Sequence, residues 1–235
     1  MRLRFLITPL VTLFFLHQGV LACQCVDPYR TPYEEFDDSA AVFVGVVTGY
    51  RDKVIDAANH TVERSFQFKV EETFKGDKLK TRDISTGLTN EICYVGFGPV
   101  GSRLVVYASE ERDKLVSYLF CRTGLGLSDV HFLRMRLRNV KEPRIYGVID
   151  REKFGRSKLR VQVVAEDSGK KIIVKPDEAG RFAVDELPDG VYLVRIEAPA
   201  GQLASSDEEY RLRLGDKVDD FGLPKKSVFL RFPIR

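Results

Sequence analysis

The sequence predicts a mainly β protein in which two small domains follow a signal peptide. Three features lead to this prediction: strand-like alternation in the first half, a regular series of short strands in the second half, and an apolar amino-terminal segment that begins with two arginines. The chain has 235 residues, of which 44% are hydrophobic and 30% charged, and this is enough apolar material for two modest cores.

The first 22 residues are typical of a secretory signal peptide. Arg2 and Arg4 form the positive start, Phe5 to Leu16 the apolar stretch, and Val20-Leu21-Ala22 a small-residue cleavage site. Cleavage there leaves Cys23 as the first residue of a secreted, extracellular chain. We expect no transmembrane segment, because no later stretch has the roughly 20 apolar residues that crossing a bilayer needs. The same residues also resemble a bacterial lipoprotein signal, which would anchor Cys23 to a surface by lipid.

Four cysteines lie beyond the signal, at positions 23, 25, 93 and 121. An even number in an oxidising compartment favours two disulfides. The alternative is a metal site, but Cys23-Gln24-Cys25 lacks the spacing of at least two residues that zinc sites usually have. Disulfides are the preferred interpretation, and we expect no cofactor.

In the first half, Ala40 to Thr48 is a nearly continuous apolar run, which suits a strand buried on both sides or bent at Gly45. Alternation at Phe66, Phe68 and Val70 indicates a strand with one wet face. Two further strands, Arg103 to Ser109 and Leu115 to Phe120, are predicted to form a hairpin.

Two short helices accompany these strands. Thr31-Pro32, followed by acids, predicts a helix capped by Thr31. A second helix is expected after Ser128 as N-cap. Its apolar face comprises Val130, Leu133 and Leu137 with Phe132 or Met135, and its arginines 134, 136 and 138 form a solvated face.

The segment Asn139 to Arg144 is the predicted linker, so that the first domain spans residues 23–139 and the second spans 144–235. The second domain is expected to be a seven-stranded β-sandwich, because short strands alternate with Gly, Pro and Asp turns. Its predicted strands are 144–148, 159–165, 171–175, 181–184, 191–197, 209–214 and 227–232.

The start Cys-Gln-Cys-Val-Asp-Pro-Tyr-Arg-Thr-Pro, followed by Ala-Ala-Val-Phe-Val-Gly-Val-Val, resembles the tissue inhibitors of metalloproteinases. This resemblance covers residues 23–138 and implies a netrin-like domain with an OB-fold barrel. It also implies that Cys23 pairs with Cys93 and that Cys25 pairs with Cys121. The second domain resembles the transthyretin-like, or prealbumin-like, modules found beside carboxypeptidases, through Ile145 to Asp150 and Leu187 to Tyr192.

The inhibitor resemblance implies an inhibitory ridge that occupies a protease active site. The amino nitrogen and carbonyl oxygen of Cys23 would chelate the catalytic zinc of a zinc endopeptidase, which keeps one coordination position open. Gln24 would enter the neighbouring substrate pocket, and the ridge would continue through Cys25 and Val26 beside Glu91, Ile92 and Cys93.

The sequence departs from the inhibitor family in three respects. No cysteines remain for the family's third disulfide, Gln24 replaces a small hydroxyl residue, and the sandwich replaces a cysteine-rich carboxyl-terminal portion. The alternative function is therefore a netrin-like interaction or adhesion module that inhibits no protease, surface-anchored by lipid at Cys23, with the sandwich as a spacer.

Other functional classes fit the sequence poorly. The net charge of +3 and the scattered basic groups argue against nucleic acid. Two histidines, His60 and His131, remain after signal cleavage in unrelated contexts, so we expect a binding protein and no enzyme. An N-glycosylation acceptor pattern begins at Asn59.

Overall fold

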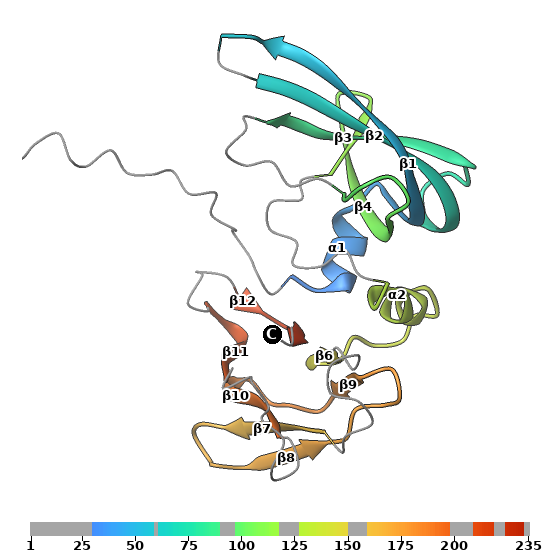
Figure 1. Cartoon of the computed structure of the whole chain (residues 1–235). Coiled ribbons are helices and arrows are strands. Elements are labelled where there is room, and N and C mark those ends of the chain that lie inside the picture. Colours follow the sequence, from blue (N-terminus) through green and yellow to red (C-terminus); the bar gives the residue numbers. More distant parts are fainter. Residues whose placement is uncertain are drawn as a thin grey trace, which may run out of the picture.

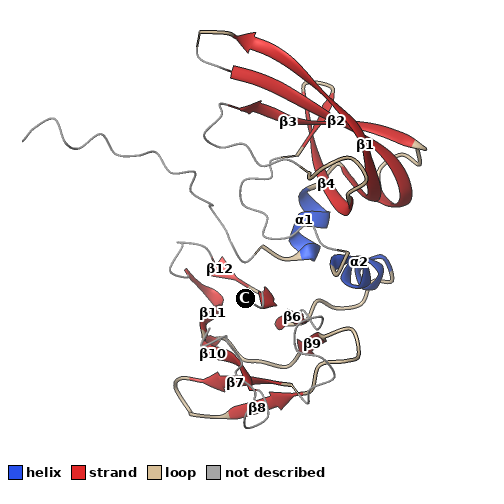
Figure 2. Ribbon diagram, in the orientation of Figure 1, coloured by secondary structure: helices blue, strands red, loops and turns tan. Residues whose placement is uncertain are grey.

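The computed structural model describes residues 30–58, 61–89, 97–117, 127–149, 159–197, 209–218 and 224–232. These residues form thirteen strands and two short helices, which confirms the predicted mainly β fold (Figure 2). The first half holds α1 (Pro32–Asp38), β1 (Ala41–Asp56), β2 (Thr61–Lys75), β3 (Thr81–Thr89), β4 (Arg103–Glu111), β5 (Lys114–Val116) and α2 (Asp129–Leu137). The second half holds β6 (Ile145–Ile149), β7 (Arg160–Ala165), β8 (Lys171–Val174), β9 (Arg181–Val184), β10 (Gly190–Glu197), β11 (Tyr210–Val218), β12 (Pro224–Lys225) and β13 (Val228–Phe232).

The first five strands form a closed barrel in the order β1-β2-β3-β5-β4 (Figure 1). Neighbouring strands are antiparallel except β3 and β5, which pair in parallel where Ser85 faces Val116. Strand β4 closes the barrel by pairing with β1 from Ala41 to Val46. The barrel interior is apolar and aromatic, with a core of Phe43, Val47, Phe66, Phe68, Ile84, Phe97, Leu104, Val106 and Ala108.

The apolar run in β1 is explained by burial on both of its faces. Phe43 and Val47 point into the barrel core, whereas Val42 and Val44 pack in a second cluster outside it. That outer cluster includes Leu133 of α2, so the helix covers the barrel wall. A strand between two apolar environments needs no polar alternation.

The predicted hairpin forms between β4 and β5, which pair in antiparallel fashion, but β5 ends at Val116. Residues 118–120 of the predicted second strand lie outside the described part of the chain. Arg112 and Asp113 make the turn with φ of 48° and 62°. Both residues adopt the left-handed conformation that a tight two-residue hairpin connection requires.

The two helices lie where the sequence predicts them, but α2 differs in its details. Ser128 occupies the N-cap position without a capping side-chain hydrogen bond, and Leu137 is 50% exposed. The predicted solvated face of α2 is instead partly ion-paired: Arg134 contacts Glu72 of β2 at 2.7 Å, and Arg136 contacts Asp37 of α1 at 2.9 Å. Both partners lie more than 60 positions away in the chain, so helical periodicity alone does not reveal these pairs.

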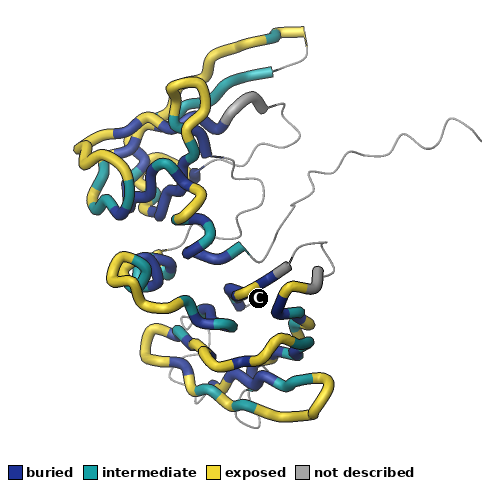
Figure 3. The backbone as a smooth tube through the Cα atoms, turned by 180° about the vertical axis from the view of Figure 1, so that it is seen from behind, coloured by how far each residue is buried: buried dark blue, intermediate teal, exposed yellow. Residues whose placement is uncertain are grey.

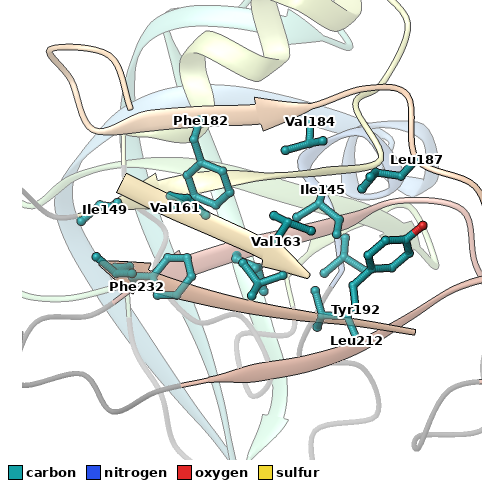
Figure 4. Close-up of a cluster of buried hydrophobic side chains, with 14 of the residues drawn as sticks. Ile145, Ile149, Val161, Val163, Phe182, Val184, Leu187, Tyr192, Leu212 and Phe232 are labelled. Carbon is teal, nitrogen blue, oxygen red and sulfur yellow. The ribbon is translucent and has the colours of Figure 1, made fainter. Parts of the chain in front are cut away.

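The second half consists of two sheets with one core between them (Figure 4). One sheet has the order β12-β11-β10-β7-β8, and the other has the order β13-β6-β9. All seven predicted strands are present, but the described residues contain an eighth, the two-residue β12, so seven was wrong. Strand β12 is too short to leave a periodic signal. The OB-fold family of the barrel and the prealbumin-like family of the sandwich stay predictions.

The three-stranded sheet is buried on both faces. In β6 and β13, Ile145, Ile149 and Leu230 belong to the sandwich core, whereas Tyr146 and Phe229 belong to a separate cluster on the opposite face. Both strands are therefore almost continuously apolar, and Figure 3 shows β13, beside the carboxyl terminus, as a buried segment.

Gly147 lies at a point of this sheet where there is no room for a side chain. Strand β6 pairs in parallel with β13, and Gly147 faces Leu230. A Cβ atom at Gly147 would lie 2.0 Å from the carbonyl oxygen of Leu230. Because that oxygen belongs to the backbone, the strands would have to separate to admit a methyl group.

We therefore expect Gly147→Ala to lower the free energy of unfolding by about 3 kcal/mol, the upper part of the range for overpacked sites. The matched control is Gly49→Ala in β1, where an added Cβ meets no atom within 4 Å. The control should change stability by less than about 0.5 kcal/mol. Urea unfolding of both variants tests this, and equal losses would contradict the close approach.

Candidate functional site

The residues of the predicted ridge lie outside the described part of the chain. Their positions and the two disulfides therefore stay predictions, as does glycosylation at Asn59. The residues concerned are Cys23, Gln24, Cys25, Val26, Glu91, Ile92, Cys93 and Cys121.

The described chain begins just after this amino-terminal segment, at a firmly held helix start. Thr31 is fully buried, and it forms a complete capping box with Glu34. The backbone N–H of Glu34 donates to Thr31 Oγ1 at 3.1 Å, and the N–H of Thr31 donates to Glu34 Oε2 at 3.0 Å. Both otherwise unpaired donors are thus satisfied, which fixes where the chain enters α1.

Four aromatic residues connect this helix to the sandwich. Tyr33 of α1 and Phe132 of α2 pack on Tyr146 of β6 and Phe229 of β13, and all four are at most 5% exposed. The ring centroids lie 4.9 Å apart for Phe132 and Tyr146, and 5.1 Å apart for Tyr146 and Phe229. Tilted and edge-on pairs at these distances add stability beyond the buried area itself. The cluster joins the two halves of the chain.

A buried ionic network lies beside the aromatic cluster. Asp129, the first residue of α2, accepts a hydrogen bond from Tyr107 Oη at 3.1 Å and forms an ion pair with Arg231 of β13. Arg231 also donates to Ser128 Oγ at 2.8 Å. Ser128 does not cap its own helix because its backbone is helical, with φ of −55° and ψ of −30°, and not extended as in a capping residue. The Arg231 guanidinium lies 4.9 Å from the ring centroid of Phe229. Arg231 of the sandwich thus binds the first residues of α2, the helix that packs on the barrel wall.

Burial raises the pKa of Asp129, and the charge of Arg231 opposes that rise. Burial also raises the pKa of Tyr107 well above its ordinary value, with a further contribution from the Asp129 carboxylate. At the other end of the interface, burial raises the pKa of Glu142, which accepts from Tyr146 Oη at 2.8 Å. Lys225 of β12, almost fully buried, lies 4.0 Å from Glu34 of the capping box.

The chemistry of this interface is that of a structural junction. Within the seven described ranges, no three His, Cys, Asp or Glu side chains come together in a way that could hold a metal ion. His131 is half-buried on α2. Burial lowers its pKa, and the positive charge of Arg181 lowers that pKa further. No helix among the described residues is long and apolar enough to cross a membrane.

Comparison with known proteins leaves the family open. No family model matches the chain. No curated protein matches it by sequence.

Sequence reasoning missed the interface residues Tyr107, Asp129 and Arg231. A signal for Arg231 was present, because it is the one charged residue in the apolar strand Val-Phe-Leu-Arg-Phe. A charge in such a strand needs a partner, but the partner lies 102 positions earlier in the chain.

Removing Arg231 should leave the Asp129 carboxylate buried without its counter-charge. We expect Arg231→Met to lower the free energy of unfolding by about 3 kcal/mol, as found when one partner of a buried pair is lost. The control is Arg134→Met, which removes an exposed pair with Glu72 and should cost less than about 1 kcal/mol. Urea unfolding at neutral pH measures both, and similar small losses would show that the network does not join the halves.

Glu142 should make the stability of the interface depend on pH. Its folded-state pKa is raised, so the folded chain binds the proton more tightly, and the wild type gains stability as pH falls through that pKa. Glu142→Gln keeps an acceptor for Tyr146 and removes the charge. The variant should be more stable than wild type at pH 7, with a difference that shrinks on acidification in thermal melts. A difference that is constant with pH would refute this origin.

Proposed function

We propose that the chain is a secreted protein-binding molecule that inhibits zinc endopeptidases through its mature amino terminus. Cys23 would place its free amino nitrogen and carbonyl oxygen on the catalytic zinc, with Gln24 in the adjoining pocket. Part of the α-amino group is uncharged near neutral pH, and zinc favours the uncharged form. An amine and a carbonyl oxygen are suitable zinc ligands at the position that the protease keeps for water.

The observation that supports this proposal best is the rigid base from which the amino-terminal segment leaves. Pro32, the first residue of α1, follows the predicted ridge residue Val26 by a few positions. The helix start is fixed by the Thr31 and Glu34 capping box and by the aromatic cluster below it. A segment that departs from a fixed base loses less conformational entropy on binding than a free terminus does.

A second candidate is protein interaction without inhibition, and the β1–β2 hairpin favours it. Strand β4 pairs with β1 only from Ala41 to Val46. Beyond Val46, β1 continues to Asp56 as a hairpin with β2 (Figure 1). Tyr50, Val54 and Ile55 in this part of β1 are 55%, 63% and 45% exposed. Three exposed large apolar side chains on one projecting hairpin offer apolar contact area to a protein partner.

Inhibition by the mature protein distinguishes the two functions. We expect mature protein starting at Cys23 to inhibit at least one enzyme in a panel of zinc endopeptidases. One additional alanine before Cys23 should weaken inhibition at least about a hundredfold, because zinc ligation contributes several kcal/mol. The matched control carries the additional alanine after Arg235 and should inhibit like the wild type.

Equal inhibition by both extended proteins would exclude the zinc-capping mechanism. Mass spectrometry of the purified mature protein belongs to the same experiment, because a lipidated or acylated Cys23 has no free amine to offer. That outcome would favour the surface-anchored interaction module.

A further inference from the structure

The larger sheet of the sandwich has an outer face on which basic residues gather. Its inner face is occupied by core residues such as Val161, Val163, Val194 and Leu212. Because successive side chains in a strand point to opposite faces, the intervening residues of β7, β8, β10 and β11 point outward. These four strands lie side by side in the lower part of the molecule (Figure 1).

The strand register places the outward residues in rows across the sheet. In one row, Arg211 of β11 faces Leu193 of β10, and Leu193 in turn faces Val164 of β7, which faces Lys171 of β8. Neighbouring rows hold the remaining basic residues. Among the side chains that the structure describes, the basic residues of this outer face are Arg160, Lys171, Arg195, Arg211 and Arg213 in the strands and Lys175 directly after β8.

Acidic residues on the outer face are fewer, and two of them are already paired. Glu166 accepts from Arg211 at 2.7 and 3.0 Å, and Glu197 lies 3.1 Å from Lys171. Six basic residues and three acidic ones, Glu166, Glu197 and Glu209, give this face a net charge of +3.

Two of the basic residues make no ion pair on this face, although Glu197 lies opposite Arg160 in the strand register. Arg160 and Lys175 are exposed, and no ion pair joins either of them to another described residue. Arg195 is also exposed and donates from Nε to the neutral Gln162 Oε1 at 2.6 Å. Positions on adjacent strands lie about 4.8 Å apart and alternate residues of one strand about 6.8 Å apart, so the cations form an open array and not a single pocket.

An open array of cations suits a linear polyanion. The uncharged side chains of the same face indicate which class of polyanion it fits. No outward residue among the described positions of this face is aromatic, whereas binding of single-stranded nucleic acid relies on base stacking. Ile173, at 48% exposed, is the one large apolar side chain of the face with an exposure above a third, which is too little for insertion into a lipid surface. Arginine forks and lysine ammonium groups bind sulfate as they bind phosphate.

We propose that the outer face of the β8-β7-β10-β11 sheet binds a linear sulfated polysaccharide, of the kind that the predicted secretion would bring the protein to meet. Arg160, Arg195 and Lys175 bind sulfate groups at one end of the face, and Arg211 and Arg213 bind them at the other. The site is remote from Cys23 in sequence and does not depend on protease inhibition. It would hold the protein on an extracellular matrix.

The test uses the full mature protein and heparin as the probe, with affinity measured by calorimetry at 50 and 200 mM salt. We expect wild type to bind, with weaker binding at the higher salt concentration. Arg160→Gln/Lys175→Gln should weaken binding about tenfold, and adding Arg211→Gln/Arg213→Gln should weaken it about tenfold again. The matched control is Lys78→Gln/Lys80→Gln, which removes two exposed charges from the barrel and should leave affinity within about twofold.

Circular dichroism melts of each variant verify that the fold is retained, and the first double variant should melt like the wild type because it breaks no ion pair. Failure of the wild type to bind heparin would overturn the proposal. Equal losses in the face variants and in the barrel control would also overturn it. Parallel titrations use a single-stranded oligonucleotide and anionic phosphatidylserine vesicles, and tighter binding of either than of heparin would assign the face to a different ligand.

Discussion

The structure depends on the burial of the outer face of the three-stranded sheet against α1 and α2. Tyr146 and Phe229 point away from the sandwich core, and Tyr33 and Phe132 point away from the barrel core. Neither pair can be removed from water within its own half. The two halves therefore stabilise one another, and the ion pair between Asp129 and Arg231 fixes how they meet, since a buried carboxylate without its counter-charge is costly.

This constraint changes the role of the sandwich. A spacer domain would share few buried residues with its neighbour, whereas here the sandwich supplies an arginine to the start of α2 and a lysine beside the capping box of α1. The helix that follows the predicted ridge thus lies between the barrel and the sandwich. Any function of the amino terminus therefore depends on α1, a helix that both domains hold in place.

Much of the fold could be predicted from local patterns. Alternation at Phe66 and Phe68 gave β2, the charged turn gave the β4–β5 hairpin, and Thr31 with Pro32 gave α1. Strand β3 was missed because its buried positions include Arg82, Ser85 and Thr86, so its sequence shows no apolar alternation.

Features that depend on pairing between distant segments could not be predicted. The apolar residues of β6 and β13 are consistent with burial in a single core. Their spacing does not reveal that they contribute to two clusters, the sandwich core on one face and the aromatic cluster on the other. The basic face was likewise hidden, because its six residues are spread from Arg160 to Arg213 and become neighbours only through the strand register. The ridge and its crosslinks came from the family resemblance and not from any periodicity.

Disulfide mapping of the mature protein by mass spectrometry under non-reducing conditions tests the proposed amino terminus most directly. We expect a chain that begins at Cys23 with an unmodified amine, a peptide pair joining Cys23 to Cys93, and a second pair joining Cys25 to Cys121. A reduced Cys23, a bond between Cys23 and Cys121, or a chain that begins elsewhere would contradict this expectation.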